Sequence, residues 1–170
     1  NVQSDFARLQ RAYIRALAGV AFVMIPGSVF LVVLANDIVD CLLGNKWSEM
    51  VLPFQILAFS LLFRTSYKIS DSVARATGAT SGRAWRQWGY AGFVFIFAWV
   101  GSGYGIEGVS FGVGVAVFIN YVLMMHLGVA ASQLAWSKIL KMYLRVFLGL
   151  ILTLSIMIFA TEIGRYYGLP

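Results

Sequence analysis

The stretch ALAGVAFVMIPGSVFLVVLA, Ala16 to Ala35, contains no charged residue. Its length matches the roughly 20 residues that a helix needs to cross the hydrocarbon of a bilayer. The composition agrees, because 60% of the 170 residues are hydrophobic and only 12% are charged. Soluble domains average about 45–50% apolar and about 25% charged residues. We therefore expect an all-α integral membrane protein.

Four further apolar stretches follow the first one, and each is long enough to form a span once its flanking residues are included. The five predicted spans cover residues 13–35, 50–70, 86–102, 107–127 and 140–161. They would form one transmembrane domain over residues 1–170. The chain opens with Asn1 rather than Met and closes directly after a span, so we expect it to be a fragment of a longer protein.

The basic residues predict the orientation of these spans, since lysine and arginine are retained on the cytoplasmic side. With residues 1–12 in the cytoplasm and residues 36–49 outside, all of the 13 basic residues except Lys46 and Arg165 fall inside. The positive-inside distribution thus accounts for the net charge of +6. We therefore do not take this charge as a sign of a nucleic-acid partner. The outer segment 36–49 is predicted to be a short amphipathic helix at the interface, anchored by Trp47.

A glycine motif lies between the third and fourth spans. Gly103-Tyr-Gly-Ile-Glu-Gly108 has the spacing of a dinucleotide-binding loop, but such a loop follows a strand and opens a helix in a soluble βαβ unit. We expect no cofactor here. The alternative is a tight turn whose glycines allow positive φ: Gly101, Gly103 and Gly105. After it, two pairs of small residues would let helices pack closely: Gly108 with Gly112, and Ser110 with Gly114.

Five segments together resemble a known family. They are FARLQRAYIRAL (6–17), Pro26, LANDIVDCLLGNKWSEMVLPFQILAFS (34–60), SVARATGAT (72–80) and YGIEGVSFGVGVAVFINYVLM (104–124). The strongest element is Leu42 to Trp47. The chain is similar over residues 6–127 to the C-terminal half of polysaccharide or lipid-linked oligosaccharide flippases of the MOP superfamily, relatives of the MATE exporters. The resemblance implies helices nine to thirteen of a twelve- to fourteen-helix transporter.

What the resemblance implies about function is transport rather than catalysis. Such proteins move an undecaprenyl-diphosphate-linked sugar repeat unit across the bacterial inner membrane, by alternating access between two lobes. This chain would supply most of one lobe. Its partners would be the lipid-linked oligosaccharide, the bilayer and an amino-terminal lobe that this chain lacks.

A polar stripe on the second span provides the candidate substrate contacts. Five residues share one face of a continuous helix: Ser60, Arg64, Lys68, Asp71 and Arg75. Gly78 would end this helix at its carboxyl terminus. Arg64 and Lys68 would attract the diphosphate, with Ser60 beside them. The alternative is that Arg64 reaches the nearby cytoplasmic interface, while Asp71 pairs with Lys68 and Arg75 along the helix.

Two polar residues of the fourth span are weaker candidates. Asn120 lies near the centre of the span, where it could line the cavity or hydrogen-bond a neighbouring helix. His126 lies near the inner end, where it could couple transport to protons or simply sit at the interface. No catalytic constellation is evident, and Cys41 is the only cysteine beside one histidine, which disfavours a metal site.

Three other functions remain open. A MATE-like multidrug or cation antiporter would need a buried carboxylate, and none of the seven acids lies in the middle of a predicted span. A membrane-embedded glycan polymerase should carry a large outer loop, whereas the predicted outer loops are short. A structural membrane subunit is the third possibility.

Overall fold

The computed structural model describes the backbone of residues 2–78 and 80–166 and the side chains of 6–78 and 82–152. Over these residues the chain is helical. Its elements are α1 (Val2–Val33), α2 (Ala35–Leu42), the 3₁₀ helix η1 (Asn45–Met50), α3 (Val51–Ala76), α4 (Thr80–Ser102), α5 (Gly105–Ser132) and α6 (Trp136–Tyr166).

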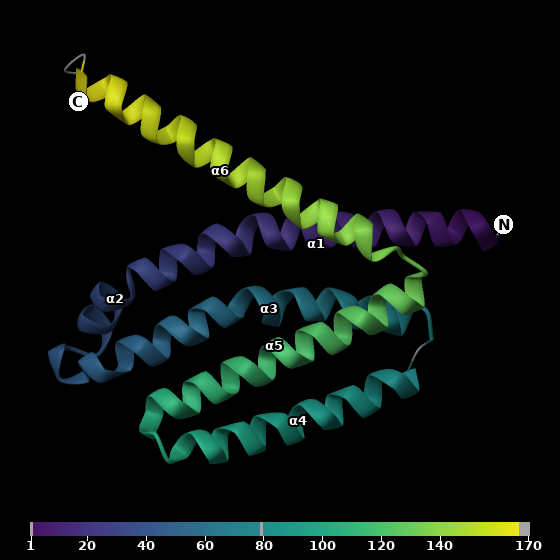
Figure 1. Cartoon of the computed structure of the whole chain (residues 1–170), viewed down its shortest axis with the longest axis horizontal. Coiled ribbons are helices and arrows are strands. Elements are labelled where there is room, and N and C mark those ends of the chain that lie inside the picture. The colour runs from purple at the N-terminus through teal and green to yellow at the C-terminus, as the bar shows by residue number, and fades with distance from the viewer. Residues whose placement is uncertain (1, 79, 167–170) are drawn as a thin grey trace.

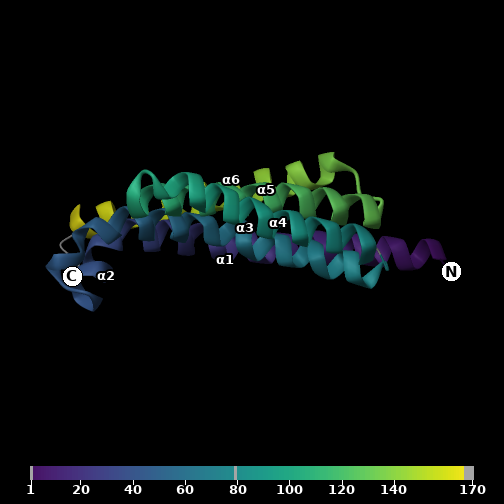
Figure 2. The ribbon, with the colours of Figure 1, turned by 90° about the horizontal axis from the view of Figure 1, so that it is seen from below.

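The five long helices run back and forth along one direction (Figure 1). The amino terminus, the α3–α4 connection and the α5–α6 connection lie at one end, which we call the amino end. The α2–η1 segment and the α4–α5 turn lie at the other, the α2 end. Seen edge-on, the molecule is much thinner than it is long (Figure 2). Each of the five segments predicted as spans falls largely within one of these long helices.

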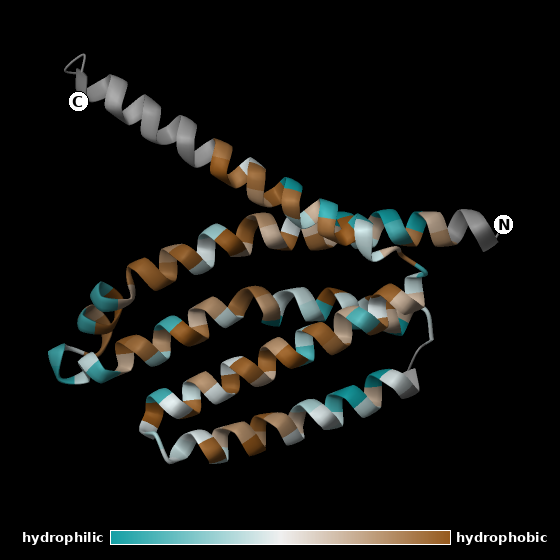
Figure 3. Ribbon diagram, in the orientation of Figure 1, coloured by the Kyte–Doolittle hydropathy of each residue, from teal (hydrophilic) through white to brown (hydrophobic). Residues whose placement is uncertain are grey.

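Three of the helices are long and apolar enough to cross a membrane, judged by length and composition. They are Phe6–Val33, Asn45–Ala76 and Gly105–Ser132. Their apolar residues occupy the middle of the helices, and hydrophilic residues gather towards the ends (Figure 3). Large side chains such as Phe30 and Phe95 are exposed, as expected where lipid covers a surface. The structure thus indicates a multi-pass membrane protein, while the five-span count stays a prediction.

The α4–α5 hairpin is held together by glycines. A methyl group on Gly101 would overlap the carbonyl of Gly108, and one on Gly112 would overlap the carbonyl of Phe97 on α4. The predicted close packing of this face is therefore confirmed. The predicted role of the turn glycines was partly wrong, because positive φ occurs at Gly105 alone of the three, at 72°. Gly101 is needed for helix contact instead.

The core lies at the amino end, where α1, α3, α5 and α6 meet. Buried side chains from all four helices form it, together with Leu134 of the α5–α6 connection: Tyr13, Leu17, Val73, Met125, Val129, Leu134, Ile139 and Met142. Polar bonds reinforce this contact. Gln10 Nε2 donates to the carbonyl oxygens of Ser132, at 2.9 Å, and Gln133, at 3.0 Å. These carbonyls belong to the end of α5, so α1 anchors the α5–α6 connection.

The helices extend beyond the predicted spans. The prediction ended each span near charged residues, whereas a helix can continue through such residues into the water outside the membrane. α3 continues to Ala76 and ends before Gly78, whose φ of 75° confirms the predicted stop. The predicted single interfacial helix over residues 36–49 is instead two pieces. Gly44, with a φ of 83°, separates α2 from η1, and Trp47 on η1 is exposed.

Candidate functional site

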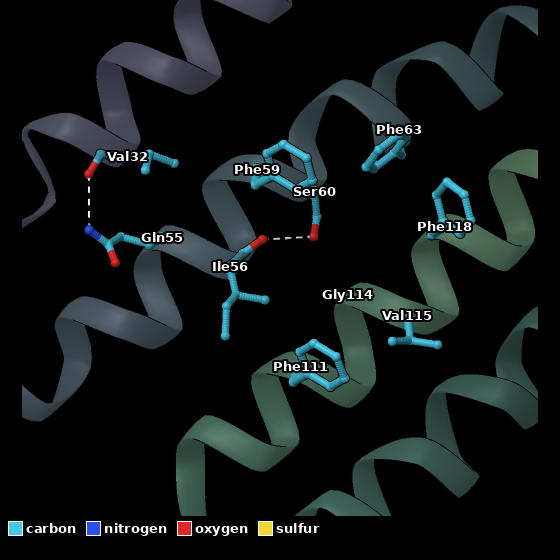
Figure 4. A pocket seen from close by; sticks show the side chains of 10 residues that line it. All are labelled: Val32, Gln55, Ile56, Phe59, Ser60, Phe63, Phe111, Gly114, Val115 and Phe118. Atoms are coloured by element: carbon cyan, nitrogen blue, oxygen red, sulfur yellow. Dashed lines mark hydrogen bonds between the residues drawn. The ribbon is translucent and has the colours of Figure 1, made fainter.

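A cavity of about 490 Å³ opens between α1, α3 and α5 (Figure 4). Its walls are mostly apolar and include four phenylalanines: Phe59, Phe63, Phe111 and Phe118. The rings of Phe63 and Phe118 meet edge to face, with centroids 5.1 Å apart. Such a wall suits an apolar chain, since burying aromatic and aliphatic surface is favourable and few polar groups interrupt it.

Two polar side chains line this cavity. Ser60 Oγ donates to the carbonyl of Ile56 on its own helix at 2.8 Å, and Gln55 Nε2 donates to the carbonyl of Val32 on α1 at 3.1 Å (Figure 4). Gln55 thus acts as the interhelical partner that its position in a span suggests, whereas Ser60 bonds within α3. A methyl group on Gly114 would lie 3.3 Å from Ser60 Oγ, so α5 packs directly over this serine.

Arg64 and Lys68 do not line the cavity. Both side chains are exposed on α3. The neighbouring Asp71 is largely buried, and its carboxylate pairs with Arg75 at 3.3 Å and with Arg83 of α4. Asp71 therefore pairs with Arg75 as one alternative predicted, but its second partner is Arg83 rather than Lys68. Within the described part of the chain, Arg64 and Lys68 have no acidic partner.

Sequence reasoning missed Arg83 because it considered pairs along α3 only. The α3–α4 connection is short, so residues just before and just after it must lie side by side. Arg83 follows that connection and Asp71 precedes it. A helical hairpin predicted at Gly78 would have placed Asp71 and Arg83 close together.

Two hydrogen bonds show where Arg64 lies along α3. Tyr13 of α1 bonds Ser70 near the amino end, and Gln55 bonds Val32 near the α2 end. Arg64 lies between these levels, about 9 Å along the axis from Ser70 at a rise of about 1.5 Å per residue. It lies near the middle of α3, which is part of a helix long and apolar enough to cross a membrane, on the side that approaches Tyr90 of α4. A cation in the middle of a span is costly unless it meets water or an anion.

Asn120 occupies a different place, fully buried on α5 away from the cavity lining. Neither its amide nitrogen nor its carbonyl oxygen has a hydrogen-bond partner among the described residues. The interhelical bond that was one alternative for this residue is therefore not made there. An unpaired buried polar group costs about 1–3 kcal/mol, so this amide is a point of strain in the helix packing.

His126 is exposed near the carboxyl terminus of α5, at the amino end of the molecule. Its ring lies beside Trp136 at the start of α6, with centroids 6.2 Å apart. It does not line the cavity. The structure therefore brings only Ser60 of the predicted site residues to the cavity. Among the side chains that the structure describes, no cluster of histidine, cysteine or acidic residues could hold a metal ion.

Comparison with known proteins gives one match. A family model described as "Polysaccharide biosynthesis protein" matches residues 1–52, which span α1, α2, η1 and the first residues of α3 and include Leu42 to Trp47. The comparisons with curated proteins and with solved structures gave no match. Over its first 52 residues the chain is thus similar to polysaccharide biosynthesis proteins, and its helices are those of a multi-pass membrane protein.

Proposed function

We propose that this chain is part of a flippase that moves a lipid-linked oligosaccharide, carried on undecaprenyl diphosphate, across the bacterial inner membrane by alternating access. Residues 1–12 face the cytoplasm and residues 36–49 face the periplasm in this arrangement. The proposal combines the polysaccharide biosynthesis match with the division of α3 into two chemically different sides.

The observation that carries the proposal is the unpaired charge on α3. Asp71 is occupied by Arg75 and Arg83, which leaves Arg64 and Lys68 available to a ligand. A diphosphate is the kind of group that such cations bind well, because charge-assisted hydrogen bonds to phosphate are short and strong. Ser60 lies one turn from Arg64, and its Oγ, which donates to Ile56, can accept a further bond from the sugar head.

The aromatic cavity complements this cationic face. It lies on the side of α3 that meets α1 and α5, and its lining is almost entirely apolar. A lipid-linked oligosaccharide has an anionic head and a long polyprenyl tail, so it requires both surfaces within one lobe. In this proposal Asn120 is a second polar contact and His126 a proton-coupling residue. The proposal depends on neither residue.

Alternating access requires a second lobe. The five long helices form a flat assembly with exposed apolar side chains (Figure 2), and a single flat layer cannot close a path from both sides of the membrane. A flippase of this kind would place the other lobe opposite Arg64, so that the cation faces a shared hydrated space rather than lipid.

The test is a charge series at Arg64 in the intact protein, expressed in cells that lack it. Arg64→Glu should abolish surface polysaccharide while the amount of protein in the membrane stays unchanged, and Arg64→Lys should keep a substantial fraction. Near-normal export by Arg64→Glu would reject Arg64 as a substrate contact. Arg11→Glu, which changes an exposed arginine on α1, serves as the matched control and should export normally.

A further inference from the structure

A second cavity, of about 450 Å³, lies between α1 and α6 at the amino end. Four cationic residues line it, and the rest of its lining is apolar. The cations are Arg15, Lys138, Lys141 and Arg145. All four side chains are exposed, so a ligand can reach them from outside the helix bundle.

No acid among the described side chains pairs with these charges. In the parts of the chain whose side chains are described, the ion pairs all involve Asp71 on α3. The cavity lining holds no acid. Four like charges around one space repel each other, and an anion between them removes that repulsion.

The position of the basic residues on α6 adds to this electrostatic repulsion. Lys138 and Lys141 lie in the first two turns of α6, which begins at Trp136. The amino-terminal end of a helix carries a partial positive charge, so cations there are disfavoured and anions are favoured. The arrangement opposes helix stability unless an anion binds, and this local conflict is typical of a functional site.

The cavity also has an apolar continuation. Arg15 is followed on α1 by the uncharged stretch that begins at Ala16, and Arg145 is followed on α6 by the one that begins at Val146. Ala18 and Val146 line the same cavity as the cations. The two helices pack together near the amino end and then separate (Figure 1). The groove therefore has a charged mouth and an apolar floor.

We infer that this groove binds the headgroup of an anionic phospholipid of the cytoplasmic leaflet, with phosphatidylglycerol as the ligand. Its phosphate lies among the four cations, and an acyl chain follows the apolar floor between the diverging helices. Basic spaces between membrane helices on the cytoplasmic side recognise such headgroups. The inference requires α1 and α6 to cross the bilayer, and it is independent of the substrate of the proposed flippase.

The test measures lipid bound to the intact protein in detergent by native mass spectrometry, with phosphatidylglycerol and phosphatidylcholine at equal concentrations. The unaltered protein should prefer phosphatidylglycerol. Arg15→Ala/Lys141→Ala should weaken phosphatidylglycerol binding on the order of tenfold or more, since each basic residue near the surface contributes about a factor of five. Arg8→Ala/Arg11→Ala removes the same charge from α1 outside the cavity and should change binding little.

Two further measurements keep the inference open to contradiction. The charge-preserving variant Arg15→Lys/Lys141→Arg should retain the preference for phosphatidylglycerol. If the alanine variant does not fold, the charge-preserving variant is the test, and loss of its preference for phosphatidylglycerol would count against the site. Inorganic pyrophosphate should not displace phosphatidylglycerol at equal concentration. Displacement would assign the cations to a soluble phosphate instead, and equal binding of the two lipids by the unaltered protein would overturn the inference.

Discussion

Tyr13 on α1 and Ser70 on α3 share a buried hydrogen bond, with Oη and Oγ 2.7 Å apart. The tyrosine is 1% exposed and the serine 0%, and no other bond to Ser70 Oγ is seen in the described part of the chain. This contact joins α1 to α3 at the amino end of the molecule, on the same helix as Arg64.

Tyr13→Phe should lower the stability of the intact protein by about 1 kcal/mol, because it leaves Ser70 Oγ buried without a partner and interhelical hydrogen bonds in membranes are of this size. Thermal unfolding of the purified protein in detergent measures the effect. Tyr104→Phe is the control, since Tyr104 is 82% exposed. An equal shift in both variants would show that the Tyr13–Ser70 bond does not stabilise the packing.

Gly128→Ala should be more damaging than Tyr13→Phe. The added methyl carbon would lie 2.7 Å from Tyr13 Oη and 3.1 Å from Ser70 Cβ, so α5 would have to move away from both helices. Overpacking of this kind costs about 1–3 kcal/mol. Gly19→Ala, which adds the same group where nothing lies within 4 Å, should not destabilise the protein.

Tyr13 and Gly128 can be tested for energetic coupling. Tyr13→Phe removes the atom that a methyl group on Gly128 would meet first, so Gly128→Ala should cost less when combined with Tyr13→Phe than in the unaltered protein. A double-mutant cycle in thermal unfolding isolates this difference. Strictly additive effects would contradict the predicted contact between Gly128 and the tyrosine hydroxyl.

Gly101→Ala should open the α4–α5 hairpin, because the methyl group would meet the backbone of Gly108, which has no side chain that could move aside. We expect loss of folded protein and faster proteolysis between α4 and α5. Gly92→Ala, on the same helix with open space around it, should leave both unchanged. Normal expression and protease resistance of Gly101→Ala would show that the two backbones need not approach so closely.

The aromatic cavity gives a functional prediction. Val115→Trp would fill the space between α3 and α5 that Phe59 and Phe118 also line. Surface polysaccharide should fall sharply at an unchanged protein level, since a lipid tail could no longer enter. Val122→Trp, on the exposed part of the same helix and outside the cavity, should export normally; equal export by both variants would remove the cavity from the transport path.

Much of this architecture could be predicted from composition and spacing. Long uncharged stretches give the long helices because a span has a fixed minimum length, and Gly78 marked the end of α3. Glycine pairs in α5 indicated close packing, but the sequence could not say that Gly101 would serve α4–α5 contact while Gly105 alone supplies the turn. That choice depends on how the two helices meet.

The candidate site was less predictable. Periodicity placed Ser60 on one face of α3 with Arg64 and Lys68, but Ser60 lines the cavity and the two cations do not. It also could not reveal that Arg83 of α4 would take Asp71's second contact. The aromatic cavity is built from residues of α1, α3 and α5, which come together only in the folded chain. The same holds for the basic groove, whose Arg15 and Lys141 are far apart in sequence.

The most direct measurement follows the lipid-linked oligosaccharide itself. In right-side-out membrane vesicles from cells with and without the intact protein, a membrane-impermeant sugar-modifying enzyme reports which leaflet holds the sugar unit. Without the protein, or with Arg64→Glu, the lipid-linked unit should accumulate in a form that the enzyme cannot reach. If the unit is fully accessible from outside yet remains unpolymerised, transport does not need this protein, and the flippase proposal is contradicted in favour of a later step such as polymerisation.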